Sequence, residues 1–435
     1  MMRPRRILFI LAVLLCSVLL HAQAAETLTP DGWRYEVVNG VAYIDSYRGA
    51  EKEVTVPARI GEYSTAIKEL KEPFDLLIIP EGVQSIAAQA FMQGNAVEVR
   101  IESAKTKIAD EAFNSCQTLQ SVTLPEGLTA LPESCFNACS SLQLVDLPQS
   151  LKVLGSNCFS GCTSLAYILL PSQLTTIEAS AFSECTALEA IDLPAAVTKI
   201  GGNAFRGCSK LEHLTIPDKV TTIGSSAFCN CSALQSIQLP PALTGSLKFS
   251  TFEGCASLTS INLPDGIDTL GNLVFKDCTS LTSVHLPASL KTVPEDLDAN
   301  DPFKNCPALT TFTAKEGSWA YKWAIDRGWR YQQPRDPNPI IIPASVVEIG
   351  EEAFTETGCR EVILSEGVQR IRSKAFAQCS QLVYVTLPES LISIADDAFG
   401  TAEAITFLLT PGSRHIAWAK QHGYHYEIVD AQTGE

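Results

Sequence analysis

The chain has 435 residues, of which 46% are hydrophobic and 18% are charged. This apolar content is enough for a large core, so intrinsic disorder is excluded for most of the chain. The 32 Lys and Arg against 48 Asp and Glu give a formal net charge of −16, which argues against a nucleic-acid ligand because its phosphates would be repelled. No apolar run outside the N-terminus reaches the roughly 18 residues that a transmembrane helix needs.

The N-terminal segment has the organisation of a secretory signal peptide. Three arginines among the first six residues precede an apolar run from Ile7 to Leu20, and the small-x-small triplet Ala22-Gln23-Ala24 follows. We therefore predict a signal peptide over residues 1–24 and a secreted or cell-surface protein. Lipid attachment at Cys16 is disfavoured because a leucine, which is not a small residue, precedes it.

A repeat of 23 residues organises the rest of the chain. Around each repeated Phe the sequence follows A-F-x-x-C-x-x-L-x-x-[IV]-x-L-P-x-x-[LV]-x-x-[IL], as in Ala181–Ile200. Self-similarity at a fixed period is the signature of repeat architectures. The repeated phenylalanines are Phe91, Phe113, Phe136, Phe159, Phe182, Phe205, Phe228, Phe252, Phe275, Phe303, Phe354, Phe376 and Phe399.

Each repeat has two apolar segments with different roles. In Ala181–Ile200, Ile191 and its neighbours alternate as in a strand with one buried face, and Pro194 ends the strand because proline cannot donate to a ladder. Val197 and Ile200 predict a second short segment on an opposite wall. One coil cannot bury its own apolar edge, so the coils must stack over a shared core. The repeat therefore predicts a solenoid.

Cysteines follow the same period. Ten of the fifteen lie three residues after a repeated Phe, where stacked coils are about 4.8 Å apart. Parallel Cβ vectors suit a disulfide badly, so we favour a ladder of buried, inert thiols that bond the backbone of neighbouring coils. Export would permit disulfides instead, and Cys135 and Cys158 on adjacent coils are the pair to test first. The ten are Cys116, Cys139, Cys162, Cys185, Cys208, Cys231, Cys255, Cys278, Cys306 and Cys379.

The repeat unit resembles the BspA-like class of bacterial leucine-rich repeats. The resemblance covers about Val54 to Pro411, and Gly32–Gly61 resembles the N-terminal cap of that family. It implies a leucine-rich-repeat solenoid with a parallel β-sheet on one face, short strands and turns on the other, and small terminal caps. It also implies export and binding to proteins or cell surfaces without catalysis. The family names no universal site residues, so none is carried over.

Two segments resemble each other and have the features of caps. Gly317–Tyr331 aligns without gaps with Gly412–Tyr426, and each predicts a short helix with an N-cap, Ser318 or Ser413, and a glycine stop. A single solenoid with a cap-like insertion is the alternative to two arrays. We expect a signal peptide (1–24), an N-terminal cap (25–60), a repeat array with a cap-like end (61–331), a Pro-rich connector (332–339), a second short array (340–411) and a C-terminal cap and tail (412–435).

Few features of the sequence point to catalysis or to metal binding. The sequence has no motif for phosphate loops, dinucleotides, zinc hydrolysis or a nucleophilic serine, so we predict no enzyme, no cofactor and no metal. Asp296 and Asp298 alternate as calcium ligands do, but the Gly and Glu of a calcium loop are missing, and a solvated acidic loop is expected. His415, His422 and His425 are expected to be surface histidines, because the matching positions of the similar segment Gly317–Tyr331 carry no histidine.

The outward positions of the predicted sheet are the candidate binding surface. Most are small and polar, but Leu144, Tyr167 and Leu169 are apolar and lie on adjacent coils, and Tyr384 is an isolated analogue on the second array. Exposed apolar patches mark partner sites. We predict a non-enzymatic protein that binds a protein or glycan ligand on a cell surface or in extracellular matrix. The alternatives are a structural spacer of the cell envelope and a calcium-dependent glycan binder.

Overall fold

The computed structural model describes residues 27–294, 296–331, 338–354, 357–377, 379, 381–400 and 405–429. The predicted signal peptide, residues 332–337 of the predicted connector and the tail from residue 430 lie outside the described residues. The chain forms two compact units, Met1–Tyr331 and Gln332–Glu435, which are described separately. Among the described residues, no helix is long and apolar enough to cross a membrane.

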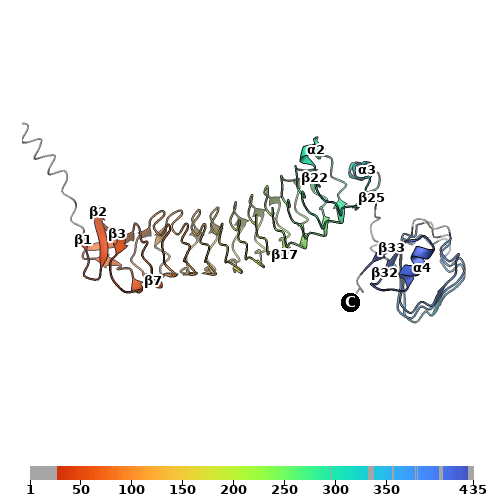
Figure 1. Ribbon diagram of the computed structural model, residues 1–435, viewed down its shortest axis with the longest axis horizontal. Coiled ribbons are helices and arrows are strands. Elements are labelled where there is room, and N and C mark those ends of the chain that lie inside the picture. Colours follow the sequence, from red (N-terminus) through yellow and green to blue (C-terminus); the bar gives the residue numbers. More distant parts are fainter. Residues whose placement is uncertain are drawn as a thin grey trace, which may run out of the picture. The chain divides into compact units, whose positions relative to one another are not determined.

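The first unit is a solenoid whose first turns are covered by a small antiparallel sheet (Figure 1). In this sheet β1 (Thr27–Leu28) pairs with β2 (Trp33–Val38), and β2 pairs with β3 (Val41–Tyr47). The hairpin turn uses Asn39 and Gly40, both at positive φ, as a two-residue turn of this hand requires. β3 then pairs in parallel with β6 (Tyr63–Ile67), which joins the sheet to the coils.

One side of the first unit, the long wall, is a parallel sheet built from the L-x-x-[IV]-x-L segments. Residues at the same place in the repeat pair with each other, for example Val122 with Val99 and Val145. The prediction of a parallel sheet is confirmed. Its strands are β4 (Glu53–Thr55), β7 (Leu76–Ile79), β9 (Glu98–Ile101), β11 (Ser121–Thr123), β13 (Leu144–Asp146), β17 (His213–Thr215), β19 (Ser236–Gln238), β21 (Ser260–Asn262), β23 (Ser283–Leu286), β24 (Thr311–Ala314) and β25 (Arg330–Tyr331).

The opposite side, the short wall, consists of much shorter parallel strands that follow each Pro turn. Their buried residue is the last apolar residue of the repeat, such as Ile200, which pairs with Ile177 and Ile223. β5 (Arg59–Ile60) pairs antiparallel with β6. Besides β6, the parallel strands are β8 (Ser85–Ile86), β10 (Lys107–Ile108), β12 (Ala130–Leu131), β14 (Val153–Leu154), β15 (Thr176–Ile177), β16 (Lys199–Ile200), β18 (Thr222–Ile223), β20 (Gly245–Leu247) and β22 (Ile267–Leu270).

The third side, the Phe turn, carries the phenylalanines in one continuous column. From Phe91 to Phe303 the neighbouring ring centroids are 4.6–5.7 Å apart and the planes differ by at most 16°. The backbone N–H of Phe113 donates to the carbonyl of Cys135 in the next coil, and this bond recurs along the column. From Phe91 to Phe275, the residues two before and two after each Phe have positive φ, as Glu111 and Ser115 do. The turn is therefore fixed by both stacking and backbone geometry.

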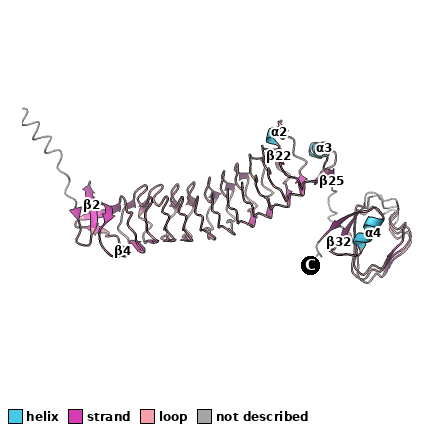
Figure 2. Ribbon diagram, viewed as in Figure 1, coloured by secondary structure: helices cyan, strands magenta, loops and turns pink. Residues whose placement is uncertain are grey.

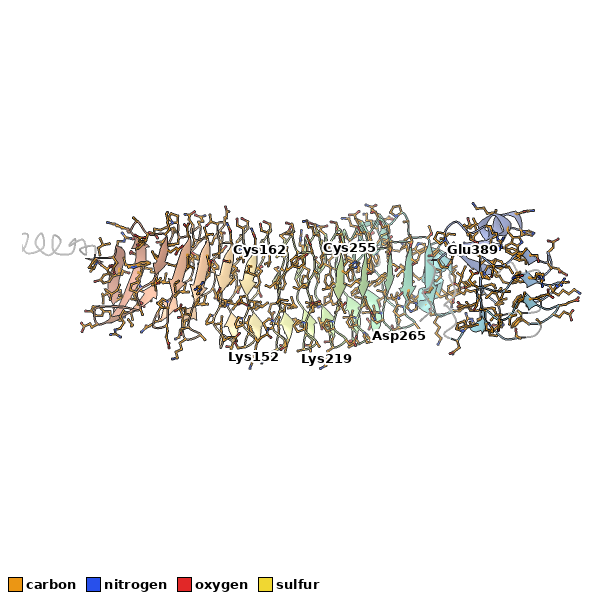
Figure 3. All side chains as sticks on the ribbon, turned by 90° about the horizontal axis from the view of Figure 1, so that it is seen from below. Lys152, Cys162, Lys219, Cys255, Asp265 and Glu389 are labelled. Carbon is orange, nitrogen blue, oxygen red and sulfur yellow. The ribbon has the colours of Figure 1, made fainter. Side chains whose placement is uncertain are left out.

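The cysteines of the Phe turn form the predicted thiol ladder. The Sγ of Cys139 donates to the carbonyl oxygen of Phe113 in the preceding coil at 3.1 Å, and the next coils repeat this bond at 3.0–3.2 Å. All described cysteines, Cys135 and Cys158 included, are free thiols. Figure 3 shows Cys162 and Cys255 at the opposite edge of the unit from Lys152 and Lys219. The ladder thus lies along one edge of the stack.

The far end of the first unit is covered by aromatic side chains. Between β23 and β24 lies α2 (Leu297–Asn300), and α3 (Trp319–Asp326) follows β24, with Ser318 as N-cap accepting from the N–H of Tyr321 at 3.1 Å. The Arg327 guanidinium lies 5.0 Å from the ring centroids of Trp323 and of Trp329 and bonds Asp301 at 2.6 Å. The predicted cap helix and its serine cap are confirmed.

The second unit is a shorter solenoid of the same design (Figure 2). Its longer parallel sheet contains β26 (Ile340–Ile342), β28 (Glu361–Leu364), β30 (Tyr384–Thr386), β32 (Thr406–Leu409) and β33 (His425–Ile428). The shorter one contains β27 (Glu348–Ile349), β29 (Arg370–Ile371) and β31 (Ser393–Ile394). α4 (His415–Gln421) lies between β32 and β33 in the chain and packs against both strands. Phe354, Phe376 and Phe399 stack at 4.8 and 5.2 Å.

The prediction that Tyr384 points outward into solvent is wrong. Its side chain is only 2% exposed, because Val383 and Leu408 form a small apolar cluster with it and Val429 packs against this cluster. The outward side of the sheet in the second unit is therefore covered at this place. Tyr384 is not an analogue of the exposed residues on the first unit.

One prediction for the C-terminal cap is also wrong. His415 is 6% exposed rather than at the surface, and its Nε2 lies 3.1 Å from the Leu391 carbonyl oxygen. His422, in contrast, is exposed as expected. The residue that precedes α4 is Arg414, which has helical backbone angles and makes no side-chain cap bond. Ser413 Oγ accepts from the N–H of His415, the first residue of α4, so a serine hydroxyl bonds the first turn of the helix in both cap segments.

Candidate interaction surface

Three apolar side chains stand out from the long wall of the first unit. The buried residues between them, Val145 and Ile168, are 6% and 5% exposed, whereas Leu144, Tyr167 and Leu169 are 63%, 60% and 81% exposed. Leu144 lies in β13, and the other two lie at the matching places of the next coil. The strand alternation that buries one side of the wall therefore puts these three side chains into solvent. We call them the apolar patch.

The ladder of the long wall is interrupted beside the apolar patch. Strand pairing ends with β13 and begins again with β17 and β19, while residues 167–169 and 190–192 belong to no strand. Within the described stretch 27–294, the coils here are joined on this wall by a backbone hydrogen bond from Glu189 N–H to the Ala166 carbonyl. The polar groups of the strand backbone are thus left to solvent or a partner next to exposed apolar side chains.

A polar chain of contacts holds Tyr167 in place. Its hydroxyl donates to Glu189 Oε2 at 2.6 Å, and Lys210 Nζ lies 3.6 Å from the other oxygen of that carboxylate. The hydrogen bond from Tyr167, aided by the positive charge of Lys210, holds the pKa of Glu189 below its ordinary value, and the same bond raises the pKa of Tyr167. The side chains of Tyr167, Glu189 and Lys210 therefore form a chain of contacts across three successive coils.

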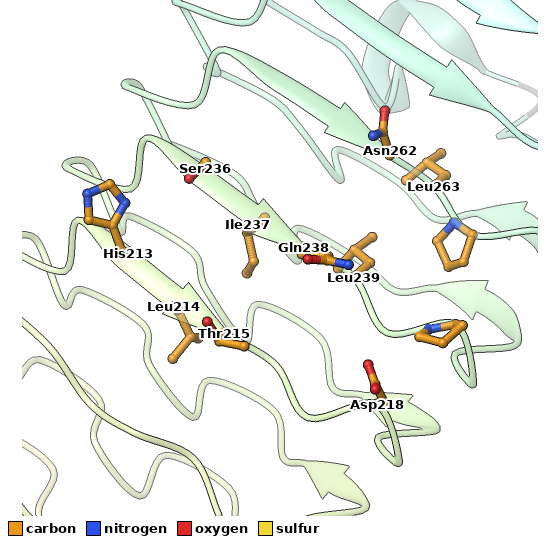
Figure 4. A pocket seen from close by; sticks show the side chains of 12 residues that line it. His213, Leu214, Thr215, Asp218, Ser236, Ile237, Gln238, Leu239, Asn262 and Leu263 are labelled. Atoms are coloured by element: carbon orange, nitrogen blue, oxygen red, sulfur yellow. The ribbon is translucent and has the colours of Figure 1, made fainter. Parts of the chain in front are cut away.

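A groove of about 640 Å³ lies farther along the long wall, over β17, β19 and β21. Its rim carries neutral polar side chains and one carboxylate, and Figure 4 shows the amides of Gln238 and Asn262 together with His213 and Asp218. No ladder joins β19 to β21 in this part of the described chain. The coil between Phe228 and Phe252 has 24 residues instead of 23, and β20 and β22 are out of register at Gly245. The extra residue lies on the short wall, in β20.

Sequence analysis placed the groove residues outward but did not predict a groove. No local sequence signal marks it, because the groove depends on the missing pairing between β19 and β21. The expected acidic loop, in contrast, contains a helical turn: Asp296 accepts from the N–H of Ala299 at 3.1 Å and Asp301 bonds Arg327. Among the described residues, no three His, Cys, Asp or Glu side chains are grouped as metal ligands are.

The thiol ladder is unsuited to nucleophilic chemistry. Burial raises the pKa of Cys116 to about 11 and that of Cys185 to about 12, and it raises the pKa of Cys162 and of Cys208 well above the ordinary value of a thiol. A thiol rather than a thiolate is then present at neutral pH, and the thiolate is the reactive form. The role of the ladder is to bond the coils to each other.

The repeat pattern, the Phe column and the two walls agree with the comparison to known families. Residues 84–212, 198–319 and 335–416 match the BspA type leucine rich repeat region. The chain belongs to the BspA-type leucine-rich repeat family. Members of this family and fold are typically non-enzymatic and bind proteins. No curated protein matches this BspA-type chain.

Two solved structures of bacterial leucine-rich repeat proteins are similar to this BspA-type chain. A leucine-rich repeat protein from Bacteroides ovatus is 22% identical, with 93% of this chain and 100% of that chain covered and a TM-score of 0.54. A leucine rich cell surface protein from Faecalibacterium prausnitzii is 23% identical, with 90% and 96% covered and a TM-score of 0.44. The similarity to the first of these supports the fold of this chain and says nothing about its function or its partner.

Proposed function

We propose that the chain is an exported, non-enzymatic protein that binds a macromolecular partner through the long wall of the first unit. The apolar patch carries this proposal, because Leu144, Tyr167 and Leu169 expose most of their side chains on adjacent coils of an otherwise polar wall. Leaving such side chains in water has no structural benefit, and exposed apolar patches mark interaction sites. The arginine-flanked apolar segment at residues 3–20 supports export.

The composition of the patch suits a protein partner better than a nucleic acid. Tyr167 offers a fixed aromatic ring with a polar tip, and aromatic residues dominate the binding energy of protein interfaces. The acidic net charge of −16 repels phosphates. We therefore expect multi-point contact with an apolar surface of a protein on a cell or in extracellular matrix, with no covalent step.

The experiment is binding of residues 25–435 to arrays of extracellular-matrix proteins and glycans, with and without the double substitution Tyr167→Asp and Leu169→Asp. We expect a hit whose affinity falls by about 100-fold or more in the double variant, as for loss of a hot spot. Val153→Asp is the matched control, because Val153 is also exposed, by 48%, but lies on the short wall. A hit that both variants retain would move the site away from the patch.

The groove supports a second candidate, which is glycan binding. Its amides and hydroxyls are neutral donors and acceptors that sugar hydroxyls pair with, and its single carboxylate is a charged acceptor. The structure offers them from three adjacent coils. The double substitution Gln238→Ala and Asn262→Ala would then abolish a glycan hit and leave a protein hit unchanged. A glycan hit abolished by a chelator would favour calcium-dependent binding instead, and no hit at micromolar concentration would favour a structural spacer.

A further inference from the structure

The thiol ladder of the second unit is broken at its first coil. The position three residues after Phe354 is Thr357 rather than Cys, and Cys359 lies two residues farther along the chain. Thr357 Oγ1 donates to the Phe354 carbonyl at 2.8 Å. The same oxygen lies 3.2 Å from Cys359 Sγ and 3.4 Å from the Sγ of Cys379, which belongs to the next coil. One hydroxyl therefore brings two thiols of adjacent coils together.

This pair is free of the constraint that keeps the ladder reduced. Ladder cysteines occupy the same place in successive coils, so their Cβ vectors run parallel and suit a disulfide badly. Cys359 occupies a different place in its coil from Cys379, so the two side chains approach from different directions. Both sulfurs lie within 3.4 Å of the same hydroxyl oxygen, Thr357 Oγ1. The pair thus has proximity without the parallel arrangement.

The pair is also the more accessible one. Cys379 is 8% exposed and Cys359 is partly exposed, whereas ladder thiols such as Cys185 and the adjacent-coil pair Cys135 and Cys158 are fully buried. An oxidant dissolved in water can therefore reach Cys359. It cannot reach the fully buried ladder thiols of the folded first unit, such as Cys185.

We propose that Cys359 and Cys379 form a disulfide when the protein meets a thiol–disulfide oxidant. The Cys359 thiolate attacks the disulfide of the oxidant, which forms a mixed disulfide and releases one thiol of the oxidant. The Cys379 thiolate then attacks Cys359 Sγ, which forms the Cys359–Cys379 bond and releases the second thiol. The protein loses two protons and two electrons, and the oxidant gains them.

The bond would tie the end of the second solenoid to its body. β26 is the edge strand of its sheet, Phe354 ends the Phe stack, and Ile341 is 62% exposed. Terminal coils of a repeat array have a neighbour on one side only and open most easily. A disulfide between Cys359 and Cys379 crosslinks this coil to the next one and opposes that opening. The disulfide would thus stabilise the end of the second solenoid, as the caps stabilise the ends that they cover.

The test is peptide mapping of residues 25–435 after treatment with oxidised glutathione or with dithiothreitol and then N-ethylmaleimide. Trypsin separates the two cysteines, because one peptide ends at Arg360 and the other begins at Ala375. We expect these peptides joined, two hydrogens lighter, in the oxidised sample alone. The melting temperature of the second unit should rise by on the order of 10 °C on oxidation, and this rise should be absent in Cys359→Ser.

Cys135 and Cys158 are the internal control, because trypsin also places them on different peptides. We expect them to remain unlinked in the same oxidised sample. Alkylated Cys359 without any linked peptide in the oxidised wild-type protein would overturn the proposal, and so would a link from Cys359 to a different cysteine. The mapping of the wild-type chain is decisive even where Cys359→Ser fails to fold.

Discussion

Replacing Phe182 by Ala perturbs the Phe column at its centre. Phe182 is fully buried, and its ring centroid lies 5.7 Å from that of Phe159 and 5.6 Å from that of Phe205. Removing a buried Phe side chain lowers the free energy of unfolding by about 3–5 kcal/mol. Each lost stacked pair adds about 0.5–1.5 kcal/mol. Because these contributions overlap, we expect a total loss of about 4–6 kcal/mol.

The effect should be local, because each coil of a solenoid contacts only its neighbours. Hydrogen–deuterium exchange read by mass spectrometry should show lost protection in peptides over residues 159–205. Peptides of the N-terminal sheet, residues 27–67, should stay protected. Phe182→Leu is the matched control: it keeps a large apolar side chain but loses both stacked pairs, so it should cost about 1–3 kcal/mol, less than Phe182→Ala.

Two results would refute this reasoning. One is a loss of less than about 1 kcal/mol in a denaturant titration of Phe182→Ala, since a buried ring with two stacked neighbours cannot be so dispensable. The other is an equal loss of protection over the whole first unit, because that would show an all-or-none unit rather than an array of coupled coils.

Three further predictions concern the turns, the cap and one ion pair. Ala138→Gly should raise the free energy of unfolding by up to about 1 kcal/mol in a denaturant titration, because Ala138 has φ +57°, which glycine adopts without strain. Ser318→Ala should lower it by about 1 kcal/mol through loss of the N-cap of α3. Hydrogen bonds from Arg372 and Arg370 hold the pKa of Glu348 at about 2. A carboxylate whose pKa is lowered by folding stabilises the folded state above the pKa of an unfolded Glu, and this stabilisation is lost as the pH falls toward the folded-state pKa. The difference in melting temperature between wild type and Glu348→Gln should therefore shrink as the pH falls from about 5 to 2. A difference independent of pH would contradict this.

The repeat made most of the fold predictable from the sequence. A 23-residue period with Phe, Cys and Pro at fixed places has few physical solutions, since each coil must bury its edge against the next. The ladder bond of Cys139 to the carbonyl of Phe113 followed from the same register. The cap helix that begins after Ser318 could also be predicted from the sequence, because capping is a local property of a few residues.

The errors arose where a residue's surroundings come from distant parts of the chain. Tyr384 has the alternation of an outward residue, but Leu408 and Val429 cover it, and no local pattern indicates this. The break in the ladder beside Tyr167 depends on how the coils stack rather than on the sequence of one coil. The groove at Gln238 is likewise absent from the repeat pattern, because it lies over β19 and β21, which do not pair.

The most direct test of the binding surface is photo-crosslinking to the partner that the arrays identify. A photoreactive amino acid is placed at position 167 in one sample and at position 153 in another, on opposite walls of the first unit. The account predicts a crosslink to the partner from position 167 and none from position 153. Crosslinking from position 153 alone would contradict it, because the partner would then lie on the short wall.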